Sequence, residues 1–258
     1  MKSVYYFGQS TADGQADMKN LLGGKGANLA EMCRLKIPVP PGFTISTEVC
    51  TYYMKHNKLP PFCKKQIINA LSKLEKIMNQ EFGSKINPLL VSIRSGGRRS
   101  MPGMMDTVLN VGLTSSTIKG LIKQTNNSRF SFDSYRRLIM MYADVVMNNL
   151  SKNNFHNLNI RRILETELSH YKSLHNITSD TELQGSDLII IVSKFQDVIN
   201  HKLGQTFPNN PKEQLWNSIV AVFKSWNSKR AIEYRKIENI PNNWGTAVNV
   251  QAMVFGNM

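Results

Sequence analysis

Two short stretches combine glycines with cationic side chains, and both could bind phosphate groups. The first reads Gly-Gly-Lys-Gly at residues 23–26 and precedes a segment, residues 27–35, whose apolar spacing predicts a helix. A lysine in a glycine turn at a helix N-terminus can offer an anion its ammonium, free backbone N–H groups and the helix dipole. It is not a Walker A loop, because the GxxxxGK[ST] spacing is absent. The alternative is that Lys25 is a solvated lysine at the start of a helix.

The second stretch covers residues 94–107 and follows a short apolar run, residues 88–93, which predicts a buried strand. Arg94 would then lie at the exit of this strand. The glycines of the loop expose backbone N–H groups, and Arg98 and Arg99 add positive charge, so the loop suits a polyphosphate. A basic surface hairpin with a glycine turn is the alternative.

The other reactive residue types give no comparable pattern. None of the five histidines forms an HxxxH or HExxH pair, so we assign them no metal or catalytic role. The three cysteines, Cys33, Cys50 and Cys63, cannot all pair within one chain and form no CxxC motif. We expect them to be reduced, structural thiols of a cytoplasmic protein.

Length and composition restrict the class of protein. The chain has 258 residues, of which 41% are hydrophobic, enough for one large domain or two small ones. No apolar run approaches the ~20 residues of a membrane span, and polar residues interrupt the N-terminal segment before it could be a signal peptide. The net charge of +14 is compatible with nucleic-acid binding, but the 32 Lys and Arg are scattered and form no basic run. A solvated basic surface is therefore favoured, and an anionic small ligand fits the same charge.

The elements that must position the two glycine stretches are short strands and helices. Strands are predicted at residues 4–7, 43–46, 88–93 and 108–113, and helices at residues 27–35, 47–56 and 64–82. Residues 37–42, Ile-Pro-Val-Pro-Pro-Gly, must be extended, because proline disfavours helix in the residue before it.

The middle of the chain, residues 115–205, has a different character, with few glycines and no proline. Helices are predicted at residues 117–124, 132–149, 156–174 and 185–202. The methionine and aromatic stripe within residues 133–148 is interpreted as core packing. These residues are therefore expected to form a helical subdomain inserted between two parts of a mixed domain.

The last part of the chain returns to mixed structure. Residues 211–238 predict two helical pieces, and residues 245–255 alternate apolar and polar side chains, which predicts a strand. No closing element follows that strand, so we expect the protein to continue beyond residue 258 and the strand to be poorly paired.

Four stretches together resemble the pyruvate, phosphate dikinase family, at the beginning of its nucleotide-binding region. They are D-M-K-N-L-L-G-G-K-G-A-N-L-A-E-M at 17–32, I-P-V-P-P-G-F-T-I at 37–45, R-S-G-G-R-R-S-M-P-G-M-M-D-T at 94–107 and W-G-T-A-V-N-V-Q at 244–251. They span nearly the whole chain, and the helical middle part is the least similar.

The resemblance implies an ATP-grasp domain that uses ATP and Mg2+ to phosphorylate a histidine on a separate swivelling domain. AMP is released, and inorganic phosphate accepts the other phosphoryl group as pyrophosphate. A barrel domain passes the phosphoryl group between the histidine and pyruvate, and the whole enzyme would be a homodimer. The family's second glycine loop is absent here, so the Mg2+ ligands are expected beyond residue 258 and no metal ligand is assigned.

The resemblance also implies roles for individual residues. Lys25 matches a phosphate-contacting lysine, and Arg94 matches the arginine at the ATP phosphates, which we take as the catalytic residue. The other expected nucleotide contacts are Ser95, Gly96, Gly103, Asp106 and Thr107 in the loop, and Gln251, Met253 and Val254 in a strand that resembles the adenine-binding hinge. Gly97 and Arg99 stand where the family usually has alanines, which predicts a looser and more basic loop.

The expected fold class is α+β, a partial ATP-grasp fold with a helical subdomain inserted in a mixed α/β lobe. The first lobe would comprise residues 1–114 and 206–244, the helical subdomain residues 115–205, and residues 245–258 would begin a truncated second lobe. With an incomplete pocket, the chain alone is expected to be inactive and to bind ATP with a Kd of ~1 mM or weaker.

Other functions remain open from the sequence. A related dikinase, such as phosphoenolpyruvate synthase or glucan, water dikinase, is one alternative, although the M-P-G-M-M-D-T and G-T-A-V-N-V-Q motifs favour pyruvate, phosphate dikinase. Two alternatives from other classes are a basic nucleic-acid-binding module and an interaction module without a ligand. A nucleic-acid shift assay at physiological salt and a thermal-shift assay with ATP would distinguish them.

Overall fold

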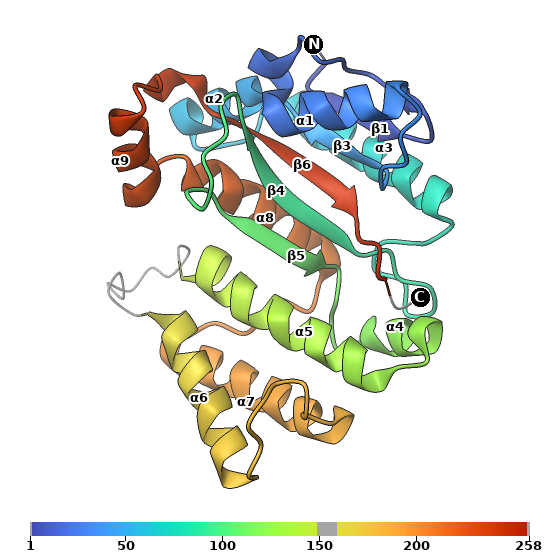
Figure 1. Cartoon of the computed structure of the whole chain (residues 1–258), viewed down its shortest axis with the longest axis vertical. Helices are drawn as coiled ribbons and strands as arrows, with labels where there is room; N and C mark the ends of the chain where they lie inside the picture. The colour runs from blue at the N-terminus through green and yellow to red at the C-terminus, as the bar shows by residue number, and fades with distance from the viewer. Residues whose placement is uncertain (1, 149–158, 257–258) are drawn as a thin grey trace. The chain divides into compact units, whose positions relative to one another are not determined.

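The computed structural model describes residues 2–148 and 159–256, which divide into two compact units (Figure 1). Unit 1 comprises Met1–Phe82, Leu89–Thr107 and Ile219–Val254, and unit 2 comprises Gly83–Pro88, Val108–Ser218 and Phe255–Met258. The chain therefore crosses between the units several times, and both units are built from segments that are distant in sequence.

Unit 1 is organised around an antiparallel β-sheet whose strands differ in length. Its strands are β1 (Val4–Gly8), β2 (Thr11–Ala12), β3 (Gly42–Ile45), β4 (Val91–Gly97) and β6 (Thr246–Ala252). They follow one another in the order β2-β1-β3-β6-β4. The pairings of β1 with β2 and β3, and of β6 with β3 and β4, are antiparallel.

The strand register gives this sheet two chemically different faces. Paired residues lie on the same side of a sheet, and successive residues along a strand lie on opposite sides. One face is apolar and carries Phe43, Ile45, Ile93, Val248 and Val250. The other face is polar and carries Thr44, Ser92, Arg94, Asn249 and Gln251. All of these residues except Arg94 are buried, so a row of polar side chains lies inside unit 1.

The strand β6 lies in the middle of this sheet, so the expectation that it would be poorly paired is wrong. Its residues pair with β3 on one side and with β4 along its whole length on the other. All seven residues of β6 are buried. The alternation of apolar and polar residues therefore does not separate a core face from a solvent face, because the strand is covered on both sides.

Helices and short turns complete unit 1. They are α1 (Lys19–Arg34), α2 (Thr47–His56), α3 (Pro61–Met78), α9 (Lys229–Ile237) and the 3-10 turn Asn242–Trp244. Helix α1 packs on the polar face of the sheet, because a Cβ on Gly26 would lie 2.8 Å from the side chain of Thr44. Strand β4 continues to Gly97, so Arg94 lies inside the strand rather than at its exit. The reason is that β6 supplies hydrogen-bonding partners as far as the Gly97–Thr246 pair.

Unit 2 is helical where the sequence predicts helices. It contains α4 (Ile118–Thr125), α5 (Ser128–Tyr142), the π-helical turn Ala143–Met147, α6 (Ile160–Leu174) and α7 (Gly185–Leu203). The predicted helices 132–149 and 156–174 extend at one end into residues 149–158, which lie outside the described residues. Two elements contain a boundary between the units, so that one part of each belongs to unit 1 and the other part to unit 2. They are β5 (Thr107–Val111) and α8 (Pro211–Ser225). In the described parts of the chain, no helix combines the length and apolar character needed to cross a membrane.

The core of unit 2 confirms the interpretation of the methionine and aromatic stripe as packing. Tyr135, Leu138, Ile139 and Tyr142 are all at most 2% exposed. The rings of Tyr135 and Tyr142 meet Phe207 edge to face, at centroid distances of 6.0 and 5.4 Å. Burial raises the pKa of Tyr135 to about 12, as expected for a phenol in an apolar core.

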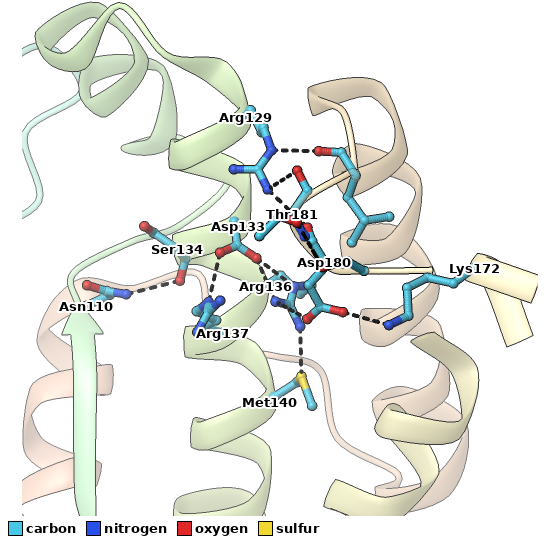
Figure 2. Close-up of polar contacts among 12 residues, drawn as sticks. Asn110, Arg129, Asp133, Ser134, Arg136, Arg137, Met140, Lys172, Asp180 and Thr181 are labelled. Carbon is cyan, nitrogen blue, oxygen red and sulfur yellow. Dashed lines mark hydrogen bonds and ion pairs between the residues drawn. The ribbon is translucent and has the colours of Figure 1, made fainter. Parts of the chain in front are cut away.

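A network of charged side chains connects α5 of unit 2 to the segment between α6 and α7 (Figure 2). The side chain of Arg136 is 4% exposed and binds two carboxylates, Asp133 at 2.6 Å and Asp180 at 3.3 Å. Asp180 also accepts a hydrogen bond from Lys172 at 2.8 Å. Arg129 donates to three backbone carbonyls of the same segment, at 2.7–3.0 Å. We call these residues the charge network of unit 2.

The boundaries expected from the sequence, after residues 114, 205 and 244, differ from the divisions between the units. The chain passes from unit 1 to unit 2 after Thr107, returns at Ile219, and residues up to Val254 belong to unit 1. The position of β6 in the central sheet explains the last difference, because its hydrogen bonds tie it to β3 and β4. The division into ATP-grasp lobes stays a prediction.

Candidate functional site

A groove of about 560 Å3 lies in unit 1 between α1 and the loop that follows β4. Its α1 side is formed by Gly24, Lys25, Asn28, Leu29 and Met32. Its other side is formed by Ser95, Gly96, Gly97, Ser100, Met101, Pro102, Gly103, Met105 and Thr107. The two glycine stretches that the sequence singles out therefore meet at one groove.

The glycine turn at the start of this groove depends on Gly23. Its φ of +67° and ψ of 167° interrupt α1, so a new helical segment begins at Gly24. A Cβ at position 23 would lie 1.8 Å from the carbonyl oxygen of Gly96, which only a glycine avoids. The start of the new segment presents backbone N–H groups that lack partners within the helix. Lys25 thus follows a helix start that is pressed against β4.

Lys25 and Arg94 are neighbouring cations. Surrounding protein atoms lower the pKa of the Lys25 ammonium from its ordinary value of 10.5, and the positive charge of Arg94 lowers it further. Lys25 itself remains exposed to solvent. Within residues 2–148 and 159–256, neither cation forms an ion pair with an acidic side chain. A bound anion would relieve the repulsion between them.

The sequence did not single out Asn249, which lies directly beside Arg94. Its Oδ1 accepts a hydrogen bond from Thr44 Oγ1 at 2.8 Å, and Thr44, Asn249 and Arg94 are paired across three strands. The Asn249 amide fits between two glycines, because a Cβ on Gly96 would lie 2.7 Å from Nδ2 and one on Gly26 3.1 Å from Oδ1. In the described residues, Nδ2 has no hydrogen-bond partner. The missing signal was the strand register, which the sequence does not contain.

Methionine and tryptophan residues hold the loop after β4 against the rest of unit 1. Met101 is buried in a cluster with Trp226, Ala231 and Ile240. Met104, Met105, Met54, Tyr234 and Trp244 are partly buried against the same cluster. The loop is therefore fixed by apolar contacts on one side, while its other side lines the groove.

Ion pairs fix the same loop at two points. Arg230 forms an ion pair with Asp106 and donates from Nε to the carbonyl of Met104 at 3.1 Å. Arg99 binds the carboxylate of Glu238 at 2.8 Å. Asp106 and Arg99 thus already have oppositely charged partners within unit 1.

The two residues that depart from the family pattern, Gly97 and Arg99, have defined contacts, and the expectation of a looser and more basic loop stays a prediction. Gly97 lies inside β4, where it pairs with Thr246, and a Cβ there would meet the carbonyl oxygen of Arg99 at 2.8 Å. The charge of Arg99 is compensated by Glu238. Both residues are therefore held by local contacts, Gly97 by strand pairing and Arg99 by its ion pair.

The structure places the expected nucleotide contacts in four places: the groove lining with Arg94, Gln251 on the sheet, Asp106, and the end of β6. Lys25, Ser95, Gly96, Gly103 and Thr107 line the groove, and Arg94 lies beside Lys25. Gln251 lies on the same face of the sheet as Arg94 and donates from Nε2 to the carbonyl of Pro40 at 2.9 Å.

Asp106 and the end of β6 are the remaining places. Asp106 is engaged by Arg230, and Met253 and Val254 follow the end of β6 without lining the groove. Val254 is 61% exposed. The roles of these three residues in nucleotide binding, like those of the residues that line the groove, stay predictions.

The described side chains do not form a set of carboxylate, histidine or cysteine ligands that could hold Mg2+. In the described part of the chain, no group of three or more His, Cys, Asp or Glu residues is arranged to hold a metal ion. The carboxylate nearest to the groove in sequence, Asp106, already binds Arg230. The groove is therefore a site of positive charge and backbone N–H groups rather than of carboxylates.

Comparison with known proteins gives consistent results. A family model described as "Pyruvate phosphate dikinase, AMP/ATP-binding domain" matches residues 19–67 and 58–258. The chain is 46% identical to "Pyruvate, phosphate dikinase" of Rhizobium meliloti (strain 1021), covering 100% of this chain and 28% of that protein. It is 47% identical to the protein of the same name from Clostridium symbiosum, covering 99% of this chain and 28% of the relative.

A plant relative gives the same picture. The chain is 45% identical to "Pyruvate, phosphate dikinase 1, chloroplastic" of Oryza sativa subsp. japonica, covering 100% of this chain and 26% of the relative. The similarity thus extends over the whole sequence described above. The chain spans just over a quarter of the length of these relatives.

Proposed function

The chain belongs to the family of pyruvate phosphate dikinase AMP/ATP-binding domains, and we propose that it binds the phosphate groups of ATP in the groove between α1 and the loop after β4. The observation that supports this most directly is the pair Lys25 and Arg94. Arg94 lies on the sheet face that α1 covers, and its positive charge lowers the pKa of Lys25. Neither cation forms an ion pair with a carboxylate of the described residues. A polyphosphate supplies the negative charge that this arrangement lacks.

The chemistry of phosphoryl transfer fits such a site. The transferred group carries charge on its oxygens, and enzymes accelerate the reaction mainly by positioning and by electrostatic stabilisation. Arg94 is fixed in a central strand and Lys25 at a helix start, so both charges are held by rigid elements. We assign Arg94 the stabilisation of the transferring phosphoryl group and Lys25 a contact to the phosphate chain.

We extend the proposal to the ATP-grasp architecture, in which the adenine lies near the end of β6. Gln251, Met253 and Val254 would contribute there, together with residues outside this chain. Ser95, Gly96, Gly103, Asp106 and Thr107 complete the proposed contacts of the loop. Mg2+ would neutralise phosphate charge in such a reaction, and since the described groove offers no set of carboxylates, its ligands would come from outside this chain.

Within a longer protein, the proposed role is the first step of the pyruvate, phosphate dikinase reaction. ATP and inorganic phosphate would be used to phosphorylate a histidine on a swivelling domain, and a barrel domain would exchange that phosphoryl group with pyruvate. The homodimer and the cytoplasmic location belong to the same proposal. The printed name of the rice relative includes "chloroplastic", which is said of that relative alone.

Titration of the chain with ATP tests the proposal. We expect the amide resonances of Lys25, Gly96 and Gly97 to shift with a Kd of ~1 mM or weaker, because few contacts of a complete pocket are present. Arg94→Gln should weaken this binding at least tenfold, whereas Arg137→Gln, in unit 2, should leave it unchanged. Shifts confined to other parts of the chain, or an unaltered Kd in Arg94→Gln, would contradict the proposed site.

A further inference from the structure

Three arginines of unit 1, one buried, one half-buried and one exposed, differ in how their guanidinium groups are satisfied. Arg235 is 1% exposed and donates from Nε to Asn242 Oδ1 at 3.0 Å and from Nη1 to the carbonyl of Trp226. Its guanidinium also lies 4.1 Å from the centre of the Trp226 ring. Arg235 is thus a structural arginine whose donors are used inside the protein.

The adjacent arginines Arg98 and Arg99 form the more informative pair. Arg99 is exposed and binds Glu238 through both its carboxylate, at 2.8 Å, and its backbone carbonyl, at 3.1 Å. Arg98 is half-buried and lies 5.4 Å from the centre of the Trp244 ring. In the described residues, Arg98 has no ion pair, and its buried Nε has no hydrogen-bond partner. A buried donor without an acceptor is costly, so such a group calls for an explanation.

The position of Arg98 suggests which acceptor is missing. Its neighbours Gly97 and Ser100 line the groove, and a Cβ on Gly24 would lie 3.7 Å from the carbonyl oxygen of Arg98. The backbone of Arg98 therefore lies beside the turn that carries Lys25. Trp244 supports one face of the guanidinium, which leaves the edges of its plane for an acceptor.

We propose that Arg98, which lies beside the groove rather than in its lining, is a third anion-binding residue and that its guanidinium binds a phosphate oxyanion at the edge of the groove. This inference rests on the proposed function, since it adds a phosphate contact to the site of Lys25 and Arg94. Guanidinium groups bind tetrahedral oxyanions through paired N–H donors, which would satisfy the buried Nε. The oxyanion could belong to the phosphate chain of a nucleotide or to free inorganic phosphate, and both have the chemistry that Arg98 recognises.

The test compares Arg98→Gln with Arg99→Gln, which changes the same charge one position along the loop. Binding of ATP, AMP and inorganic phosphate is measured by calorimetry or by NMR titration for the wild type and both variants. We expect Arg98→Gln to weaken phosphate-dependent binding about tenfold and Arg99→Gln to leave it within twofold. A loss for ATP but not AMP would assign the contact to the outer phosphates, and a loss for inorganic phosphate in the presence of ATP would assign it to the free anion.

The wild-type protein provides a measurement that does not depend on the folding of a variant. The Nε–Hε resonance of Arg98 should shift when inorganic phosphate or ATP is added, and that of Arg235 should not. Equal affinities in all arms for wild type and Arg98→Gln, or an unresponsive Arg98 resonance, would overturn the inference and leave Arg98 as a support for Trp244. Failure of ATP to bind the wild type at all would instead contradict the proposed function, while the response of Arg98 to inorganic phosphate still decides this inference.

Discussion

The groove of unit 1 and the charge network of unit 2 use the same side chains in opposite ways. In unit 2, Arg136 is buried between two carboxylates, and Lys172 shares one of them (Figure 2). In unit 1, Lys25 and Arg94 lie together without any carboxylate partner among the described residues. Compensated charges hold elements in place, whereas uncompensated charges are available to a ligand. This difference separates structural cations from candidate binding cations without any knowledge of conservation.

The largest effect is expected for Arg94 in a full-length protein that contains the histidine domain. Arg94→Ala should reduce ATP-dependent phosphorylation of the histidine by about 10²–10³-fold, because it removes one preorganised charge at the transferring group. The measurement is the rate of single-turnover phosphorylation with radiolabelled ATP. The control is Arg137→Ala, which changes an exposed arginine of unit 2 that is paired with Asp133, and it should retain the wild-type rate. A near-normal rate for Arg94→Ala would show that Arg94 does not act on the phosphoryl group, and that a cation without a carboxylate partner is not thereby a binding residue.

The next effect tests the structural side of the comparison. Asp133→Asn removes a carboxylate from buried Arg136 but leaves it Asp180, so we expect a loss of about 2–3 kcal/mol in the free energy of unfolding. Glu238→Gln, which removes the partner of exposed Arg99, should cost only ~0–1 kcal/mol. Urea denaturation of the two variants gives both values. ATP binding should be the same in Asp133→Asn and wild type, and a reversed order of stability would contradict the structural role of the network.

The smallest effect concerns the pKa of Lys25. Burial and the charge of Arg94 both lower this pKa, so Arg94→Gln should raise it towards its ordinary value of 10.5. Between the lower pKa of Lys25 in the folded protein and its higher pKa in the unfolded chain, the unfolded chain binds more protons. The free energy of unfolding therefore rises with pH in this interval. Arg94→Gln should narrow the interval, because it brings the two pKa values closer together. The pKa is read from the side-chain NMR signals of Lys25 during titration. Arg99→Gln serves as the control, and an identical Lys25 pKa in wild type and Arg94→Gln would show that the two cations do not interact.

The sequence predicts the local parts of this molecule well. The helices at 47–56 and 185–202 and the strands at 4–7 and 43–46 match α2, α7, β1 and β3 within one residue at each end. These segments have clear periodicity, capping residues or flanking prolines, and each signal is contained within a few positions. The convergence of the two glycine stretches on one groove agrees with the family resemblance, which implies that both contact the phosphates of one nucleotide.

The parts that sequence analysis misses depend on long-range pairing. The apolar pattern predicts that the strand ends before Arg94, whereas β4 continues to Gly97, because only the partner strand β6 shows how far the pairing extends. For the same reason, β6 was expected at a poorly paired edge and Asn249 was not noticed. The contacts of the two loop departures, Gly97 and Arg99, are made with Thr246 and Glu238, which are far away in sequence.

The position of β6 has a consequence for how the protein folds. Thr44 and Asn249 are hydrogen-bonded neighbours that are 205 positions apart, and most of unit 2 lies between them in the sequence. Contacts of such separation form slowly, because a long loop must close before they contribute. We expect the individual helices of unit 2 to acquire structure first, since the hydrogen bonds within a helix join residues that are close in sequence. Until β6 arrives, β3 and β4 have open edges, and during synthesis on the ribosome these edges are the part of the chain most exposed to wrong partners.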